Sequence, residues 1–392
     1  MVAFLNFADL GLGNGLLNSL AKNNASDDRS QAQKDVSTAF FLLAAIAAAL
    51  GLGLVATSSI LHWGDFFRLG TSEAGLEVSS AVAAFFIAFL ISVPFAVGQK
   101  IELAYQTGYR FNASFGVATL LSFGGLLAAI WADAGLPLLV AAAVAPLALA
   151  GAISSLRNFF WTRPWLRPQL SKVNKVSVRL IAGSGVLFLA LQVSVSLSYS
   201  LDNVVITRVL GPAAVPSYAI PFKLFNTVHF LISVLMAPLW PAYREAFVRR
   251  DHPWIRQTLR RSIYISLAVG TACALVLVIG GRSILHLWLG RDLETSTGLL
   301  VGLGLWTVLA GVGTAIAMFL NGTGILRVQV VLALLMTVAN VGLSIFLVSR
   351  IGIEGAIWST VISYSLIVMI PLVFYIPRLL ARLGADFAAT KE

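Results

Sequence analysis

The chain has 392 residues, of which 58% are apolar and only 11% are charged, with a formal net charge of +10 and a mean hydropathy of +0.88. Charged residues make up about a quarter of an ordinary soluble protein, and a chain of this length has too little interior to hide so much apolar surface from water. A soluble domain is therefore excluded, and the composition predicts an all-α polytopic membrane protein.

About eleven apolar runs are long enough to cross a bilayer as helices, which takes about 20 residues. In chain order they cover residues 2–21, 36–62, 78–98, 112–132, 135–156, 180–206, 217–240, 263–289, 297–320, 326–348 and 354–377.

The basic residues predict the orientation of these helices. Segments 157–179 and 241–262 each hold six Lys or Arg residues, whereas the loops after even-numbered helices hold few. Because basic residues of short loops stay on the cytoplasmic side, both segments are predicted to be cytoplasmic. A basic charge spread over such loops does not form the water-exposed surface that nucleic acid requires, so no nucleic acid partner is expected.

The basic segment 157–179 divides the predicted helices unevenly. We expect an amino-terminal lobe of about five helices (1–156), a basic cytoplasmic linker (157–179), a carboxy-terminal lobe of about six helices (180–377) and a cytoplasmic tail (378–392). Two related six-helix halves are common among transporters, so this division predicts that a first helix should precede residue 1. The alternatives are that eleven helices suffice or that the first segment lies at the membrane interface.

No motif for covalent chemistry is recognisable in the sequence. It lacks GxxxxGK[ST], HExxH and GxSxG, its four histidines are dispersed, and Cys273 is its single cysteine. We therefore expect neither catalytic residues nor a metal centre or cofactor, and no enzyme activity.

Polar residues inside the first apolar segment are a candidate for a functional site. Asp9 and Asn14 both fall within it. A charge at bilayer depth costs about 2.5–3.5 kcal/mol on insertion scales, so such side chains face a cavity or pair with neighbouring helices. Whether Asp9 and Asn14 line a substrate path or hold helices together stays open at this point.

Asp202 and Asn203 lie towards the expected outer end of the sixth segment. A carboxylate in a central helix is suited to couple transport to a cation. It is equally suited to a structural pair with Lys223 or Arg208, and both interpretations stand.

The seventh segment is predicted to have one polar side. Lys223, Asn226, Thr227 and His229 fall on one arc of a helix with 100° per residue, and Phe225 lies on the other side. A cation there is suited to bind a phosphate or another acidic group. The alternatives are that Lys223 extends to the lipid headgroups and that His229 only packs.

Several motifs along the chain resemble one family. The motifs are Asp-Leu-Gly-Leu-Gly-Asn-Gly at 9–15, Asp-Asn-Val-Val-Ile at 202–206, Phe-Lys-Leu-Phe at 222–225, Pro-Leu-Trp-Pro-Ala-Tyr at 238–243, Asn-Gly-Thr-Gly at 321–324 and Gly-Ile-Glu-Gly-Ala at 352–356. They are similar to those of bacterial polysaccharide biosynthesis proteins, the Wzx-type flippases of the multidrug/oligosaccharidyl-lipid/polysaccharide (MOP) exporter superfamily.

The resemblance implies a MATE-like fold of two six-helix lobes around a central cavity, with twelve helices where this chain has about eleven. It implies a protein of the bacterial inner membrane that flips a polyprenyl-pyrophosphate-linked glycan from the inner to the outer leaflet by alternating access. Lys223 would then contribute to a cationic cavity for the headgroup. The lipid bilayer, the glycan lipid and other polysaccharide assembly proteins are the implied partners, and the coupling ion, Na⁺ or H⁺, is not specified.

Two other functions remain open. A cation-coupled multidrug exporter of the same superfamily would favour acidic cavity residues, and Lys223 argues against it. A membrane glycosyltransferase or polysaccharide polymerase would place acidic catalytic residues on an outer loop, where residues 63–77 offer Asp65, Glu73 and Glu77 without an accompanying motif.

Overall fold

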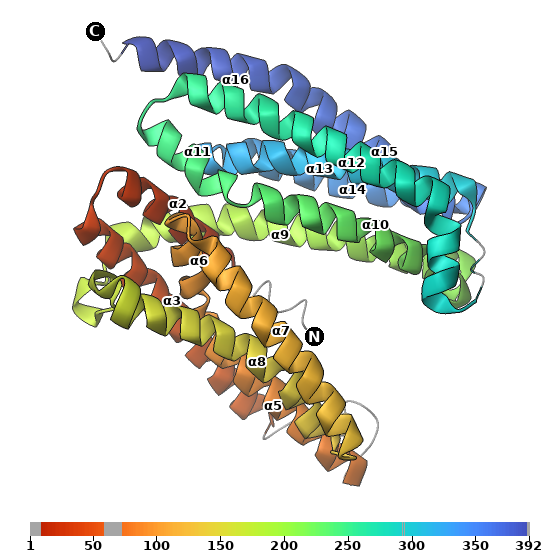
Figure 1. Cartoon of the computed structure of the whole chain (residues 1–392), viewed down its shortest axis with the longest axis horizontal. Helices are drawn as coiled ribbons and strands as arrows, with labels where there is room; N and C mark the ends of the chain where they lie inside the picture. Colours follow the sequence, from red (N-terminus) through yellow and green to blue (C-terminus); the bar gives the residue numbers. More distant parts are fainter. Residues whose placement is uncertain (1–8, 59–72, 292, 294, 390–392) are drawn as a thin grey trace. The chain divides into compact units, whose positions relative to one another are not determined.

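The computed structural model describes residues 9–58, 73–291, 293 and 295–389, and every regular element in these ranges is helical (Figure 1). Ten helical stretches are long and apolar enough to cross a membrane. They are Arg29–Thr57, Ala74–Ala104, Gly108–Trp131, Leu136–Thr162, Lys175–Leu210, Pro212–Val248, His252–Leu289, Thr297–Thr323, Leu326–Ile351 and Glu354–Ala385. Each coincides with one of the predicted segments from 36–62 onward, so the prediction of a polytopic all-α protein is confirmed.

The first predicted segment, 2–21, is only partly described. Residues 2–8 lie outside the described residues, and α2 (Leu12–Ala25) has 14 residues. The predicted outer loop 63–77, with its acidic residues, also lies largely outside the described residues, because residues 59–72 and the Glu73 side chain are not described. Glu77 has a structural partner: its carboxylate accepts a 2.6 Å hydrogen bond from the Leu136 backbone N–H at the start of α8.

Several helices are longer than hydropathy predicts, because a helix can continue beyond the membrane with polar residues. Within the basic segment 241–262, α11 (Leu239–Val248) is followed by the first turns of α12 (His252–Leu289). The Asp251 carboxylate accepts a 3.1 Å hydrogen bond from the Trp254 N–H and so caps α12. At the carboxy terminus, α16 (Ile370–Ala389) runs through most of the predicted tail.

Residues up to Leu189 form one compact unit, called unit 1. It contains α2, α3 (Arg29–Ser58), α5 (Glu73–Phe95), α6 (Val97–Ala104), α7 (Gly108–Trp131), α8 (Leu136–Arg157) and the first part of α9 (Lys175–Leu210). Helix α8 packs against both α5 and α7, and short helical turns between 158 and 172 connect α8 to α9 (Figure 1).

Helix α2 packs closely against the first part of α9 through glycines. A Cβ atom on Gly15 would lie 2.5 Å from the Ile181 carbonyl oxygen, and one on Gly11 would lie 2.3 Å from the Gly185 carbonyl oxygen. Gly11 also has a φ of +75°, which side chains other than glycine rarely adopt. The two backbones approach each other as closely as small residues allow in membrane helices.

Residues from Ala190 onward form unit 2, which is organised around α13 (Thr297–Thr323). This helix packs against α10 (Val215–Met236), α11, α12 and α15 (Glu354–Tyr364). In its most apolar stretch of 18 residues, 67% of the residues are buried. Helix α14 (Leu326–Ile351) packs against α15, which continues through a π-helical turn, η5 (Ser365–Met369), into α16.

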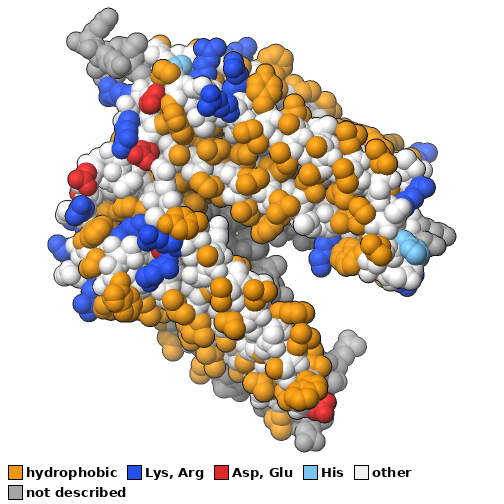
Figure 2. All heavy atoms as spheres, in the orientation of Figure 1, with side chains coloured by type: hydrophobic (Ala, Val, Ile, Leu, Met, Phe, Trp, Pro, Cys, Tyr) orange, Lys and Arg blue, Asp and Glu red, His pale blue; other side chains and the backbone are white. Residues whose placement is uncertain are grey.

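The outer faces of both units are apolar. Leu120 in unit 1 is 73% exposed, and Ile279 in unit 2 is 83% exposed. In Figure 2, hydrophobic side chains cover the visible length of α7 and α8, and basic side chains gather at the end of unit 1 where α6 meets α7. Such faces are stable in lipid and not in water, so the chain is a multi-pass membrane protein.

Candidate functional site

Asp9 and Asn14 are brought together by a cation that the sequence interpretation did not include. Lys100 of α6 donates a 2.7 Å hydrogen bond to the Asn14 side-chain oxygen, and its Nζ lies 3.7 Å from Asp9 Oδ2. The other carboxylate oxygen of Asp9 accepts a 3.0 Å hydrogen bond from the Gly11 N–H. Asp9 and Asn14 are buried, so in unit 1 they join α2 to α6.

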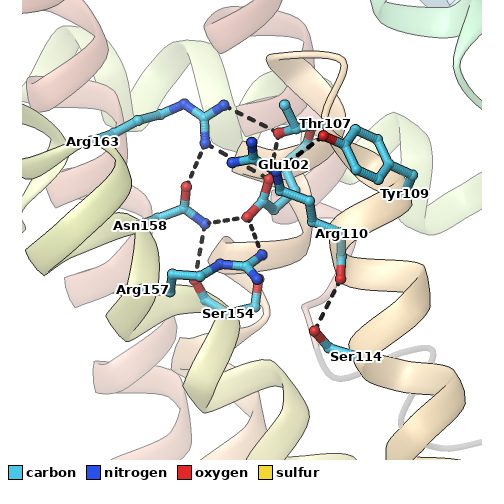
Figure 3. A network of polar contacts seen from close by, with 9 residues as sticks. All are labelled: Glu102, Thr107, Tyr109, Arg110, Ser114, Ser154, Arg157, Asn158 and Arg163. Atoms are coloured by element: carbon cyan, nitrogen blue, oxygen red, sulfur yellow. Dashed lines mark hydrogen bonds and ion pairs between the residues drawn. The ribbon is translucent and has the colours of Figure 1, made fainter.

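A second buried charge in unit 1, Glu102, is the centre of a larger network (Figure 3). Its carboxylate lies 2.7 Å from Arg157 Nη2 and 3.7 Å from Arg163 Nη1. It also accepts hydrogen bonds from the Asn158 amide at 3.1 Å and from the Thr107 hydroxyl. Glu102 is fully buried. Its partners come from the end of α8 and the turns that follow, except Thr107, which lies just before α7.

The network fixes the segment after α8 rather than presenting a free acid. Arg163 Nη1 donates a 2.6 Å hydrogen bond to the Asn158 side-chain oxygen, and its Nη2 donates one of 3.1 Å to the Thr107 hydroxyl. Burial lowers the pKa of Arg163 from its ordinary value, and Glu102 opposes that shift. An arginine titrates so far above neutrality that it stays charged, so the Glu102 carboxylate is matched by two cations.

In unit 2, Asp202 is the most enclosed of the predicted site residues. It is 3% exposed, and its Oδ2 accepts hydrogen bonds from the Tyr218 hydroxyl at 3.0 Å and the Thr360 hydroxyl at 3.3 Å. Its Oδ1 is buried without a hydrogen-bond partner. Asn340 accepts from the hydroxyls of Thr360, at 3.4 Å, and Ser363, at 3.2 Å. A carboxylate of α9 thus contacts a polar cluster from α10, α14 and α15.

One of the two alternatives for Asp202, a structural pair with Lys223 or Arg208, is not found among the described residues, and the coupling role stays a prediction. Neither Lys223 nor Arg208 forms an ion pair with it, although the structure describes all three side chains. Tyr218 takes this place, because it lies one helix turn before Phe222 on the buried side of α10 while Lys223 lies on the exposed side. Asn203, next to Asp202, is half-buried, and its side-chain oxygen has no hydrogen-bond partner.

The polar residues of α10 lie mostly on its exposed side. Lys223, Asn226 and Thr227 are exposed, whereas Phe225 is buried. The Thr227 hydroxyl donates a 3.1 Å hydrogen bond to the Lys223 carbonyl oxygen, which satisfies it within the helix. The amino group of Lys223 has no carboxylate in ion-pair contact within the described ranges, so a cation and an amide are presented together.

His229 is separated from this group and lines a cavity inside unit 2. Its Nε2 lies 3.0 Å from the Thr314 hydroxyl oxygen. The cavity has a volume of about 230 Å³ and is mostly apolar, with Gln329, Thr360 and Tyr364 among its polar lining residues. His229 therefore has a hydrogen-bond partner on α13, as the packing interpretation requires, and it also reaches a cavity.

The sequence interpretation missed Lys100 and Glu102. Both lie just after the predicted apolar segment 78–98, in the sequence Gln-Lys-Ile-Glu, and were assigned to a loop by hydropathy. The sequence does contain a sign of their role. Lys100 and Glu102 lie on either side of the apolar Ile101 at the end of a membrane segment, where charged side chains need partners.

The family follows from comparison with known sequences. Residues 1–297 match the family described as polysaccharide biosynthesis protein. The chain belongs to this family. A curated relative, the putative O-antigen transporter of Salmonella typhimurium, is 22% identical over 179 residues, which are 45% of this chain and 41% of the relative. The match thus spans about two fifths of that relative's length.

Solved structures show that this family member has a MATE-like fold, as the sequence predicted. A MATE protein in the bent conformation matches 98% of this chain and 86% of its own, with a TM-score of 0.79 and 17% identity. A MOP superfamily transporter from Pyrococcus furiosus matches 97% of this chain and 86% of its own, with a TM-score of 0.78 and 16% identity. The curated relative and the Pyrococcus furiosus protein are both named as transporters and not as enzymes, in line with the expectation from the sequence.

Proposed function

We propose that the chain is a flippase that moves a polyprenyl-pyrophosphate-linked oligosaccharide from the inner to the outer leaflet of the bacterial inner membrane. A sugar-pyrophosphate headgroup does not cross hydrocarbon unaided. A polar cavity that is exposed alternately to the two sides can carry it while the lipid tail stays in the membrane. The reaction needs no covalent step, which fits a family of polysaccharide biosynthesis proteins with a transporter fold.

The observation that carries the proposal is the exposed polar side of α10. Lys223, Asn226 and Thr227 lie in a stretch otherwise rich in Phe, Val, Leu and Ile. An exposed cation on a membrane helix is costly in lipid, so this side is expected to face a water-filled path. An ammonium without a carboxylate partner attracts phosphate, and amide and hydroxyl groups suit a sugar.

Asp202 is our candidate for the coupling group. A buried carboxylate with one oxygen unpartnered can bind a proton, or can join hydroxyl and amide oxygens around Na⁺, because hard cations prefer oxygen ligands. Tyr218, Thr360 and Asn340 supply such oxygens nearby. The gradient of that ion across the membrane would then drive the conformational change.

The test is a flipping assay with the purified chain in liposomes. A polyprenyl-pyrophosphate oligosaccharide with a fluorescent sugar is placed in both leaflets, and a membrane-impermeant reductant bleaches the outer leaflet. Protein-free liposomes should keep half of the fluorescence, whereas active protein should let the reductant bleach nearly all of it. Retention of half the signal with folded protein, under either ion gradient, would contradict the proposal.

A cation-coupled multidrug exporter is the second candidate, and the likeness of the fold to multidrug MATE proteins favours it. The same liposomes, loaded with a fluorescent cationic drug, separate the two functions. Drug efflux without glycan-lipid flipping would select the exporter. The enzymes that assemble and extend the glycan are the expected partners of the flippase.

A further inference from the structure

A cavity at the basic end of unit 1 has no role in the function described so far. It has a volume of about 430 Å³ and opens where α2 leads into α3 and α6 leads into α7. That volume lies within the range of small-molecule sites. Its lining includes Asp27, Asp28, Arg29, Arg110, Arg163 and Trp165.

Each of the three arginines that line this cavity contacts an aromatic ring. The Arg29 guanidinium lies 4.8 Å from the ring centre of Trp165, and that of Arg163 lies 4.5 Å from Tyr105. Arg110 lies 5.7 Å from the ring of Tyr109, whose hydroxyl accepts a 3.2 Å hydrogen bond from Arg110 Nε (Figure 3). Aromatic contacts hold a guanidinium in place without cancelling its charge.

The acidic residues around the cavity neutralise these cations only in part, because Glu102 is shared between Arg163 and Arg157. Asp28 accepts a 2.9 Å hydrogen bond from the Gln31 N–H in the first turn of α3. Asp27 lies 3.7 Å from Arg29, and the Asp27 side chain is 89% exposed. A pair so exposed to water is weak. Within the described residues, Arg110 has no carboxylate in ion-pair contact, so its charge is available to a ligand.

The start of α7 also contributes backbone N–H groups to the cavity. Helix α7 begins at Gly108 with no acidic residue in its first turn, and the Thr107 side chain does not cap it. The unpaired N–H groups and the dipole of a helix start favour an anion. When Glu102 and its second partner Arg157 are counted with the lining, four guanidiniums stand against three carboxylates, and the remaining charge of +1 suits a phosphate-bearing group.

We propose that this cavity binds the phosphate groups of a lipid headgroup at the basic end of unit 1, through Arg29, Arg110 and Arg163. On the proposed function, on which this step rests, the ligand is the pyrophosphate of the glycan lipid before it is flipped. Basic segments of membrane proteins face the cytoplasm, which is the side where the substrate begins. Tyr105 supports the site as a neutral phenol, since burial raises its pKa.

The test measures binding to the full-length protein in neutral detergent by calorimetry. The probe is geranylgeranyl pyrophosphate, and geranylgeraniol, which has no phosphate, is the reference. Arg110→Gln is expected to raise the Kd of the probe at least tenfold. Arg350→Gln is the matched control, because Arg350 also lies 5.7 Å from a ring, that of Phe346, but belongs to unit 2. It should leave the Kd unchanged.

Two competitors identify the source of the phosphate. Inorganic pyrophosphate should displace the probe, and phosphatidylglycerol in mixed micelles should not. Equal displacement by phosphatidylglycerol would overturn the assignment to the glycan lipid in favour of a bound phospholipid. Equal Kd values of the probe for wild type and Arg110→Gln would exclude the cavity as the binding site. Arg29→Gln repeats the test in a second variant, provided that its midpoint of thermal unfolding equals that of wild type.

The flipping assay separates this proposal from the proposed function. Wild-type flipping together with Arg110-independent binding would overturn the cavity alone. Arg110-dependent binding without flipping by the wild type would overturn the flippase and leave a phosphate site.

Discussion

The Lys100 ammonium donates a 2.7 Å hydrogen bond to the side-chain oxygen of Asn14, and so joins α6 to α2 within unit 1. Asp9 lies on the other side of the same ammonium, at 3.7 Å. Asp9 and Asn14, the two polar residues of the first segment, therefore share a structural partner. Of the two roles that the sequence left open for them, this arrangement favours a contact between helices over the lining of a substrate path. Removing the Lys100 cation should therefore lower the stability of the protein rather than its ability to bind substrate.

Lys100→Met is expected to lower the free energy of unfolding by about 3–5 kcal/mol, because it leaves the Asp9 carboxylate buried without its cation. The double variant Lys100→Met/Asp9→Asn should recover most of the loss, since no charge is then left unpaired. The measurement is the midpoint of thermal unfolding in detergent. Equal midpoints for the single and double variants would show that the ion pair contributes nothing.

Glu102→Gln should be similarly destabilising, by about 3–5 kcal/mol, since Arg157 and Arg163 would lose the carboxylate that they share. The matched control is Glu245→Gln. Glu245 forms a 2.6 Å ion pair with Arg249 one helix turn away, but the arginine side chain is 63% exposed, so a change within about 0.5 kcal/mol is expected. Trypsin digestion of the 157–179 segment offers a second measurement, and it should accelerate only in Glu102→Gln.

Gly15→Ala should destabilise by about 1–3 kcal/mol, because the new methyl group would lie 2.5 Å from the Ile181 carbonyl oxygen and force α2 away from α9. Gly53→Ala is the control: no atom lies within 4 Å of the corresponding position, and alanine favours a helix more than glycine does. Thermal unfolding of both variants decides the matter. A stabilised Gly15→Ala protein would mean that the close approach of the two helices is not needed.

The membrane helices were predictable because each consists of a continuous run of mostly apolar residues, and ten such runs correspond to helices of the structure. The partners of the polar residues were not predictable in the same way. Lys100 meets Asn14 across 86 residues of sequence, and Glu102 meets Arg157 across 55, so no local pattern pairs them. Hydropathy also ended the third segment at residue 98, which placed Lys100 and Glu102 in a loop although α6 contains both.

Helical periodicity predicted the exposed side of α10 only in part. Lys223 and Asn226 are exposed and Phe225 is buried, but His229, predicted on the same arc, is half-buried and contacts Thr314 of α13. Periodicity could not assign the partner of Asp202. Tyr218 reads in the sequence as one aromatic residue among many, and only the packing of α10 against α9 brings its hydroxyl to the carboxylate.

Asp202→Asn should remove the dependence of flipping on an ion gradient, because an amide keeps the shape of the side chain but neither binds a proton at neutral pH nor carries the negative charge that attracts Na⁺. We expect the gradient-driven rate to fall at least tenfold, which is about 1.4 kcal/mol in activation free energy. Tyr218→Phe removes a hydrogen bond to the same carboxylate but keeps its charge, and it should retain the gradient dependence. If Asp202→Asn keeps the full response to both gradients, the coupling group lies elsewhere.

Lys223→Ala should slow the flipping of a pyrophosphate-linked glycan about tenfold, whereas Lys223→Arg should retain most of the rate, because the proposed requirement is a cation on the exposed side of α10. The control is Lys175→Ala, which removes the same charge from another exposed lysine, at the start of α9. Because a lysine that only extends to the headgroups would be replaceable by alanine, equal rates for Lys223→Ala and wild type would remove this residue from the mechanism. A loss in Lys175→Ala as large as in Lys223→Ala would mean that the protein's overall charge, rather than the position of this cation, governs the rate.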